Sequence, residues 1–213
     1  MIFVSPGRCA TKRIAEILRA KLPPEEFSIT HQMAFSRLAN VAGNLMYHFG
    51  QSEKIKEELY YCITSKYIKG THFITTDPLS AMMIPESWIK SENVCIVQVT
   101  RNPEAFAESF YRFSRERIKS FIAHNFVPFW QIGVWPLENS LNKKIKNKYI
   151  KIAKQKENWF QTLYATNPNF FKIHMDELFK NGVLENLIKQ FFMKSVPISQ
   201  EELLTKANQT KDI

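Results

Sequence analysis

The first twelve residues, Met1-Ile-Phe-Val-Ser-Pro-Gly-Arg-Cys-Ala-Thr-Lys12, decide the fold that we expect for the whole chain. Residues 2–4 form a short apolar run that predicts a buried strand, and the small residues after it predict a turn. Apolar residues then recur at helical spacing from Ile14 to Leu18, which predicts a helix. This strand–turn–helix unit favours an anion, because free backbone N–H groups and the positive end of the helix dipole meet in the turn.

Side-chain donors surround the same turn, at Arg8, Thr11, Lys12 and Arg13. We therefore expect a phosphate or sulfate group as the ligand. The nucleotide-loop pattern Gly-x4-Gly-Lys-Ser/Thr is absent, since Ala10 and Thr11 stand where the second glycine and the lysine would be required. An ordinary strand–turn–helix unit with a surface arginine would fit the same residues.

The length and net charge of the chain limit the number of domains that it can form and the kinds of partner that suit it. With 213 residues, we expect one α/β domain that spans residues 1–213. The net charge of +9 suits a polyanionic cofactor, an acidic acceptor, nucleic acid or an anionic membrane surface, and does not choose among them. No nucleic-acid recognition module is visible, so we expect no nucleic-acid partner.

Hydropathy and cysteine usage favour a cytoplasmic protein, or a chain cut from a longer one. No run approaches the roughly 18 apolar residues of a membrane span, and the N-terminus resembles a strand rather than a leader. Cys9, Cys62 and Cys95 lie far apart without zinc-site spacing, so we expect neither disulfides nor a metal. Cys9 adjoins a cationic loop that could lower its pKa, but no Cys/His pairing supports a thiol enzyme.

Strands and helices are predicted to alternate along the rest of the chain. Further strands are expected at residues 27–32, 71–76, 93–100 and 169–174. Helices are expected at residues 33–67 with a break near 50–52, and at 79–84, 104–122, 142–165 and 183–192. This alternation predicts a three-layer α/β fold with a central, mostly parallel sheet flanked by helices.

Two segments have unusual composition. Residues 125–139 are rich in tryptophan and proline and predict an irregular loop of a kind that often covers a binding site. The helix expected at residues 142–165 is very basic, and we expect its lysines to form a solvated outer face, with attraction of an anionic acceptor as the alternative. These lysines are Lys143, Lys144, Lys146, Lys148, Lys151, Lys154 and Lys156.

Polar residues follow four of the predicted strands: Arg8, His31, Asp77 and Arg101. In open parallel sheets, ligands bind at the carboxyl ends of the strands, so these side chains are candidates for one site. Ser109 lies eight residues after Arg101, in the next helix. An arginine at a strand end and a hydroxyl on the following helix can share one phosphate group.

Two motifs resemble those of sulfotransferases that use 3′-phosphoadenosine 5′-phosphosulfate (PAPS). Residues 7–12 resemble the family's 5′-phosphosulfate loop, with Ala10 in place of its usual second glycine. Residues 97–103 and 107–111, which contain Arg101 and Ser109, are similar to its 3′-phosphate motif.

Later landmarks extend the resemblance over nearly the whole chain. Trp159 within a helix, Asn167-Pro168-Asn169 before a strand, and Asp176-Glu177-Leu178-Phe179 after it resemble the family's last third. The resemblance implies a P-loop-kinase-like parallel sheet that binds PAPS as co-substrate without a metal. Another nucleotide-gripping loop of the family has no clear copy here, and Lys206 and Asn208 are its faint candidates.

The resemblance assigns two anion subsites. The 5′-phosphosulfate would be lined by residues of the first loop, and Arg101 and Ser109 would hold the 3′-phosphate. The loop residues are Gly7, Arg8, Cys9, Ala10, Thr11 and Lys12.

Sulfuryl transfer requires a base for the acceptor and positive charge at the leaving phosphate. We expect Arg8, Thr11 and the helix N-terminus to stabilise the leaving group. His31 is the expected base, because its ordinary pKa suits proton transfer near neutrality and several branches of the family carry the base soon after this strand. Asp77 is the reserve base. A hydrogen-bonded structural histidine, and an aspartate that caps a turn, would explain the same positions.

The function expected from the sequence is therefore transfer of the PAPS sulfuryl group to a hydroxyl or amine of a small-molecule or carbohydrate acceptor. A P-loop-type kinase is one alternative, although it would need the missing nucleotide-loop lysine. A catalytically degenerate protein that binds a nucleotide or another polyanion is the second alternative, which the alanine at position 10 keeps open. The sequence does not indicate which oligomeric state the protein adopts.

Overall fold

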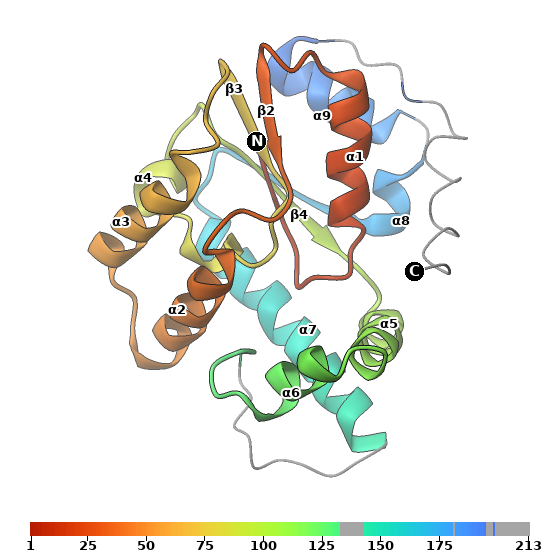
Figure 1. Cartoon of the computed structure of the whole chain (residues 1–213). Helices are drawn as coiled ribbons and strands as arrows, with labels where there is room; N and C mark the ends of the chain where they lie inside the picture. The colour runs from red at the N-terminus through yellow and green to blue at the C-terminus, as the bar shows by residue number, and fades with distance from the viewer. Residues whose placement is uncertain (133–142, 181, 195–197, 199–213) are drawn as a thin grey trace.

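The computed structural model describes residues 1–132, 143–180, 182–194 and 198, and its centre is a five-stranded sheet (Figure 1). The strand order is β2-β3-β1-β4-β5, and every described pair of neighbours is parallel. The strands are β1 (Ile2–Val4), β2 (Phe27–Thr30), β3 (His72–Thr75), β4 (Cys95–Thr100) and β5 (Asn169–His174). The predicted α/β class and the predicted parallel sheet are both confirmed.

Helices connect the strands and cover both faces of the sheet. They are α1 (Thr11–Lys21), α2 (Ser36–Phe49), α3 (Glu53–Thr64), the 3₁₀ turn η1 (Ala81–Met83), α4 (Glu86–Ile89), α5 (Pro103–Arg115), α6 (Ile118–Phe126), α7 (Lys143–Tyr164), α8 (Met175–Leu178) and α9 (Val183–Phe192). On one face, α1, α8 and α9 pack over one apolar core; on the other, α2 to α5 and α7 pack over a second core. Both faces of the sheet are therefore covered, as the continuous apolar run of β4 requires.

The side chains of β4 point alternately to the two faces of the sheet, so this strand contributes residues to both apolar cores. Cys95, Val97 and Val99 face the core beneath α1 and α9, whereas Ile96 belongs to the core beneath α7. Gln98 lies on the α7 side, because its Nε2 donates to the Glu157 carbonyl at 2.9 Å. A polar side chain thus enters the second core near the carboxyl end of the sheet.

The helix predicted over residues 104–122 is wrong as a single element. The structure divides it into α5 and α6, because Arg117 adopts an extended backbone with φ −133°. The second helix also continues to Phe126, so the expected loop begins later than residue 125. Residues 133–139 of that loop lie outside the described residues. The break matters because it places Arg117 at the junction of the two helices.

The expectation that the α7 lysines form one solvated face is wrong for Lys156, of which 4% is exposed. Lys151 and Lys154 are exposed as expected. The helix follows the predicted apolar spacing through Tyr149 and Phe160, and Lys156 falls on that inward stripe. The other changes are small: β2 ends at Thr30 rather than at residue 32.

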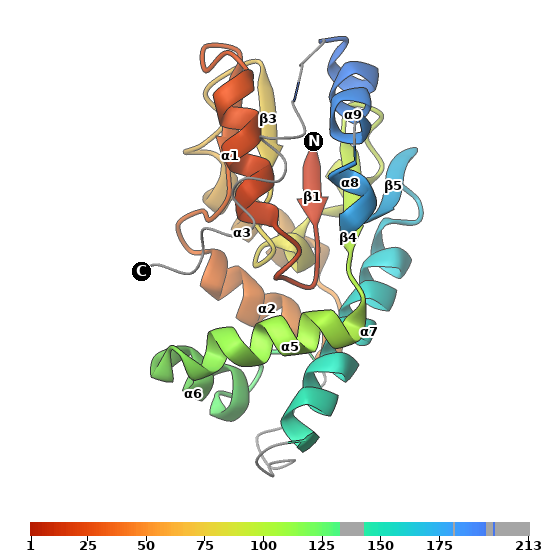
Figure 2. The ribbon, with the colours of Figure 1, turned by 90° about the vertical axis from the view of Figure 1, so that its right-hand side faces the viewer.

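The carboxyl ends of all five strands lie along one edge of the sheet, because all are parallel. Figure 2 shows β1 ending above α5, with the loop before α1 between them. This edge is where the predicted site residues gather. None of the described helices is long and apolar enough to cross a membrane.

Candidate anion-binding site

The loop from Ser5 to Ala10 turns back on itself through left-handed backbone. Gly7 has φ 102°, Arg8 φ 54° and Ala10 φ 56°. The Ser5 hydroxyl accepts a hydrogen bond from the Gly7 amide at 3.2 Å and tightens the turn. Cys9, whose φ is not positive, lies between the left-handed residues Arg8 and Ala10. Such an alternation directs successive N–H groups to one side, an arrangement that binds anions.

The N-terminus of α1 is open to such an anion. Ala10 caps the helix without a side-chain hydrogen bond, and the first turn contains no acidic residue. The first amides of an 11-residue helix and its dipole are therefore available to an external negative charge. Ala10 is also the position at which the resemblance to sulfotransferases expects glycine, and its positive φ is the conformation that glycine adopts without cost.

Two arginines from distant parts of the sequence meet at this loop. Arg8 Nε donates to Ser109 Oγ at 3.4 Å, a contact between residues 101 positions apart. Arg101 Nη1 donates to the Arg8 carbonyl at 2.8 Å. The predicted 5′-phosphosulfate loop and the predicted 3′-phosphate pair thus form one cationic surface.

The start of α5 positions Ser109. Pro103 occupies the first helical turn, and Asn102 caps it by accepting a hydrogen bond from the Ala105 amide at 2.9 Å. One helical turn after Ser109 lies Phe113, whose ring centroid is 4.7 Å from Cζ of Arg8. The Arg8 side chain therefore contacts two side chains that lie on the same face of α5.

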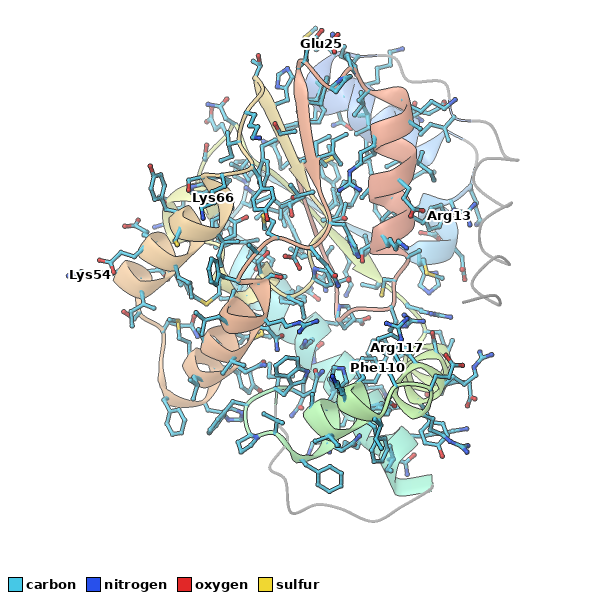
Figure 3. The ribbon with its side chains drawn as sticks, in the orientation of Figure 1. Arg13, Glu25, Lys54, Lys66, Phe110 and Arg117 are labelled. Atoms are coloured by element: carbon cyan, nitrogen blue, oxygen red, sulfur yellow. The ribbon has the colours of Figure 1, made fainter. Side chains whose placement is uncertain are left out.

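Arg117 is a further cation at this site that the sequence did not indicate. Its Cζ lies 5.0 Å from the centroid of the same Phe113 ring. Figure 3 shows Arg117 at the junction of α5 and α6, on the side that faces the loop before α1. The sequence offered no signal, because the residue approaches the site only where the expected helix breaks.

The arginines repel one another. Partial desolvation, followed by the charges of Arg101 and Arg117, lowers the pKa of the Arg8 guanidinium, and Glu116 opposes this effect. A ligand with several negative charges would relieve the repulsion. The site is thus better matched to a polyanion than to a single carboxylate.

The side chain of Glu157, in α7, contacts the backbone of Arg101. Its Oε1 accepts a hydrogen bond from the Arg101 amide at 3.4 Å, and burial raises the pKa of its carboxyl group. This residue comes from α7, 56 positions away along the chain, so no local pattern could have indicated it.

His31 lies at the end of β2, half-buried beside α1. Burial is the main cause that lowers the pKa of His31, with the charges of Arg19 and Lys12 adding to it. Its Nδ1 is 3.1 Å from Thr76 Oγ1 and 3.3 Å from the Thr76 carbonyl, which can only accept. The proton therefore belongs on Nδ1, and the lone pair is on Nε2.

Asp77, the reserve base, is 1% exposed, and its carboxylate is engaged with the backbone. Oδ2 accepts from the Met33 amide at 3.2 Å and Oδ1 from the Leu79 amide at 2.9 Å. Burial raises the pKa of Asp77 to about 6. These contacts favour a structural role that ties the end of β3 to the start of α2.

The other loop residues predicted to bind the 5′-phosphosulfate differ in burial and in their contacts. The Cys9 side chain is fully buried, and burial raises its pKa to about 12, so the thiol is neutral. The thiol donates a hydrogen bond to the Gly7 carbonyl at 3.2 Å, which ties it to the loop itself. Thr11 is buried at the first position of α1. Lys12 is exposed and lies 3.7 Å from Glu16. Lys206 and Asn208 lie outside the described residues.

No known protein-family model matches this chain, and no curated protein matches it. Among the described residues, no group of three or more histidine, cysteine, aspartate or glutamate side chains could hold a metal ion.

Proposed function

We propose that the protein is a PAPS-dependent sulfotransferase that transfers the sulfuryl group to a hydroxyl or amine acceptor. The observation that carries the proposal is the contact of Arg8 with Ser109 and Arg101, which joins the two predicted anion-binding motifs at one sheet edge. PAPS carries anionic groups at both its 5′ and 3′ positions, so it requires two such motifs side by side.

The residues divide the chemistry between them. His31 Nε2 takes the proton of the acceptor as the acceptor oxygen bonds to sulfur, and the bond between sulfur and the bridging phosphate oxygen breaks. Arg8, Thr11 and the N-terminus of α1 stabilise the negative charge left on the phosphate, which departs as 3′,5′-ADP. Arg101 and Ser109 hold the 3′-phosphate, which does not react.

Nucleotide binding without transfer is the second candidate function. It is favoured by Asp77, which is engaged by backbone amides and is therefore a poor substitute if His31 does not act as base. Binding of 3′,5′-ADP together with no release of 3′,5′-ADP from PAPS, with or without added hydroxyl compounds, would identify this function.

Calorimetric titration with 3′,5′-ADP, 5′-AMP and magnesium-ATP tests the proposal. We expect the 3′-phosphorylated nucleotide to bind best, and Arg101→Ala to weaken it at least tenfold while changing 5′-AMP binding little, since charge-assisted contacts contribute about 1.5–3 kcal/mol. Arg115→Ala is the matched control, because Arg115 is exposed on α5 over the Tyr111 ring. A preference for magnesium-ATP would instead support a kinase and contradict the proposal.

A further inference from the structure

Most of the large apolar side chains that the described residues expose lie on α2 and α6 or directly beside them. Their exposed fractions run from 37% at Leu45 to 74% at Ile118. Single exposed apolar residues are ordinary on a protein surface, whereas a group of them on neighbouring elements marks an interaction surface. The group consists of Phe35, Leu38, Leu45 and Phe49 at α2, and of Ile118, Ile122, Phe126 and Val127 at α6.

The exposed apolar residues of α6 form a stripe along the helix. Ile118, Ile122 and Phe126 recur every four residues, so they lie on one face. Another face of α6 packs on α5, where the His124 ring centroid lies 4.6 Å from that of Phe110. The stripe is thus a second apolar face of α6, and the core of the protein does not use it.

The segment after α6 joins this stripe to α2. The Phe129 carbonyl accepts a hydrogen bond from Asn44 Nδ2 at 2.8 Å, and the Phe129 ring centroid lies 5.7 Å from that of Phe49. Val127 precedes Phe129 by two residues, and Leu45 lies one helical turn before Phe49. The exposed apolar residues of the two helices therefore form one surface (Figures 1 and 2), which we call the α2–α6 surface.

The segments that form this surface contain no carboxylate. Residues 31–52 and 117–132 include neither aspartate nor glutamate. The carboxylates that border them have partners of their own: Glu53 Oε1 accepts from Lys56 at 2.8 Å, and Glu116 acts on the charge of the anion site. Acidic side chains therefore do not repel an anionic partner here.

Basic side chains lie at the edges of the same surface. Arg37 is next to Leu38 and Lys119 is next to Ile118, and both cations are exposed. Arg117, at the start of α6, faces the loop before α1 (Figure 3). A symmetric dimer through this surface would bring like charges together, because each copy would present the same patch. The charges instead favour a partner that is apolar within and negative at its surface.

We propose that the α2–α6 surface binds the surface of an anionic lipid bilayer. Ile118, Ile122 and Phe126 enter the boundary between headgroups and acyl chains, as the apolar face of an interfacial helix does. Arg37 and Lys119 bind the phosphates of the lipid headgroups. The contact is peripheral, since none of the described helices could cross the bilayer. It does not rest on the proposed function, because no nucleotide takes part.

Co-sedimentation with lipid vesicles tests the apolar part of the contact. We expect binding to vesicles of phosphatidylcholine mixed with phosphatidylglycerol, and much weaker binding to phosphatidylcholine alone. Ile122→Ser combined with Phe126→Ser should weaken binding at least tenfold, because both side chains lose apolar area that the bilayer would bury. Ile55→Ser combined with Tyr61→Ser is the matched control, since it changes exposed apolar residues of α3 and should leave binding unchanged.

Substitution of the basic residues tests the electrostatic part. Arg37→Gln and Lys119→Gln should each weaken binding to the mixed vesicles several-fold, and together they should reduce its dependence on salt. Lys54→Gln, which removes an exposed cation of α3 far from α6 (Figure 3), should change neither. Every substituted side chain is exposed, so we expect the variants to stay folded, and thermal unfolding of each one checks this.

No binding to the mixed vesicles, equal binding to both kinds of vesicle, or equal losses in the α6 and α3 double variants would overturn the inference. Sedimentation velocity covers the other occupant. A dimer that is lost in the α6 double variant, in a protein that does not bind vesicles, would overturn the inference and assign the surface to a second copy of the chain. These outcomes are independent of 3′,5′-ADP binding, so a failure here would leave the proposed function standing.

Discussion

The carboxyl edge of the sheet has two halves that use polar side chains differently. After β1 and β4, Arg8 and Arg101 keep their charges near the surface, where their neighbours are a hydroxyl, an aromatic ring and another arginine. After β2 and β3, His31 and Asp77 are bonded to the chain itself, through Thr76 in one case and two amides in the other. Arg8 and Arg101 are thus placed to bind an anionic ligand. The contacts of His31 and Asp77 instead hold an imidazole ring and a turn of the chain in place.

The largest expected effect is in the cationic half. Arg8→Ala should lower the rate of 3′,5′-ADP release from PAPS by about 1,000-fold, because one preorganised donor at a developing anion contributes about 3–4 kcal/mol. The rate should be measured with water alone and with added hydroxyl compounds as acceptors. Arg8→Lys keeps the charge without the fork of donors and should recover only part of the loss. A normal rate in Arg8→Ala would remove the loop from the chemistry.

The second prediction concerns His31. His31→Ala should lower the same rate by about 100-fold, as expected for loss of a general base, and should leave 3′,5′-ADP affinity unchanged. Because the reaction needs the neutral imidazole, the wild-type rate should rise with pH through a pKa below 6.5 and be level above it. If the alanine variant keeps both the rate and the pH profile, His31 belongs with Asp77 as a structural residue.

The third prediction concerns Asp77 and stability. Its folded pKa of about 6 exceeds the unfolded value, so the folded state binds more protons and the free energy of unfolding falls as pH rises from about 4 to about 6. The shift of about two units corresponds to about 3 kcal/mol. Denaturant unfolding across this range should show that dependence in the wild type, with Asp77→Asn lacking it. The same slope in both proteins would assign the dependence to other groups.

The smallest expected effect is at Ala10. Ala10→Gly should raise the free energy of unfolding by up to about 1 kcal/mol, because glycine adopts positive φ without the steric cost paid by alanine. Ala20 lies exposed within α1, so Ala20→Gly should instead lower it by about 1 kcal/mol. The free energy of unfolding of both variants can be measured by thermal or chemical unfolding. Equal changes in the two variants would show that the positive φ of Ala10 has no cost in stability.

Local patterns were sufficient for most elements of the sheet. The β-branched run at residues 93–100 and the apolar spacing at residues 183–192 predicted a strand and a helix that the structure contains. They failed at residues 104–122, because the same polar and apolar residues suit one long helix or two short ones. No glycine or proline marks the break between α5 and α6, and the second helix packs on the first through the rings of His124 and Phe110.

By itself, the sequence determined the strand–turn–helix start, the parallel α/β class and the polar residues at four strand ends, since these depend on neighbours within a few positions. The tertiary structure decided which of those residues meet. It brought Arg8 to Ser109, added Arg117 and Glu157, engaged Asp77 with backbone amides, and placed Lys156 inside rather than outside. These outcomes depend on which helix faces cover the sheet, a choice made by contacts between segments far apart in the chain.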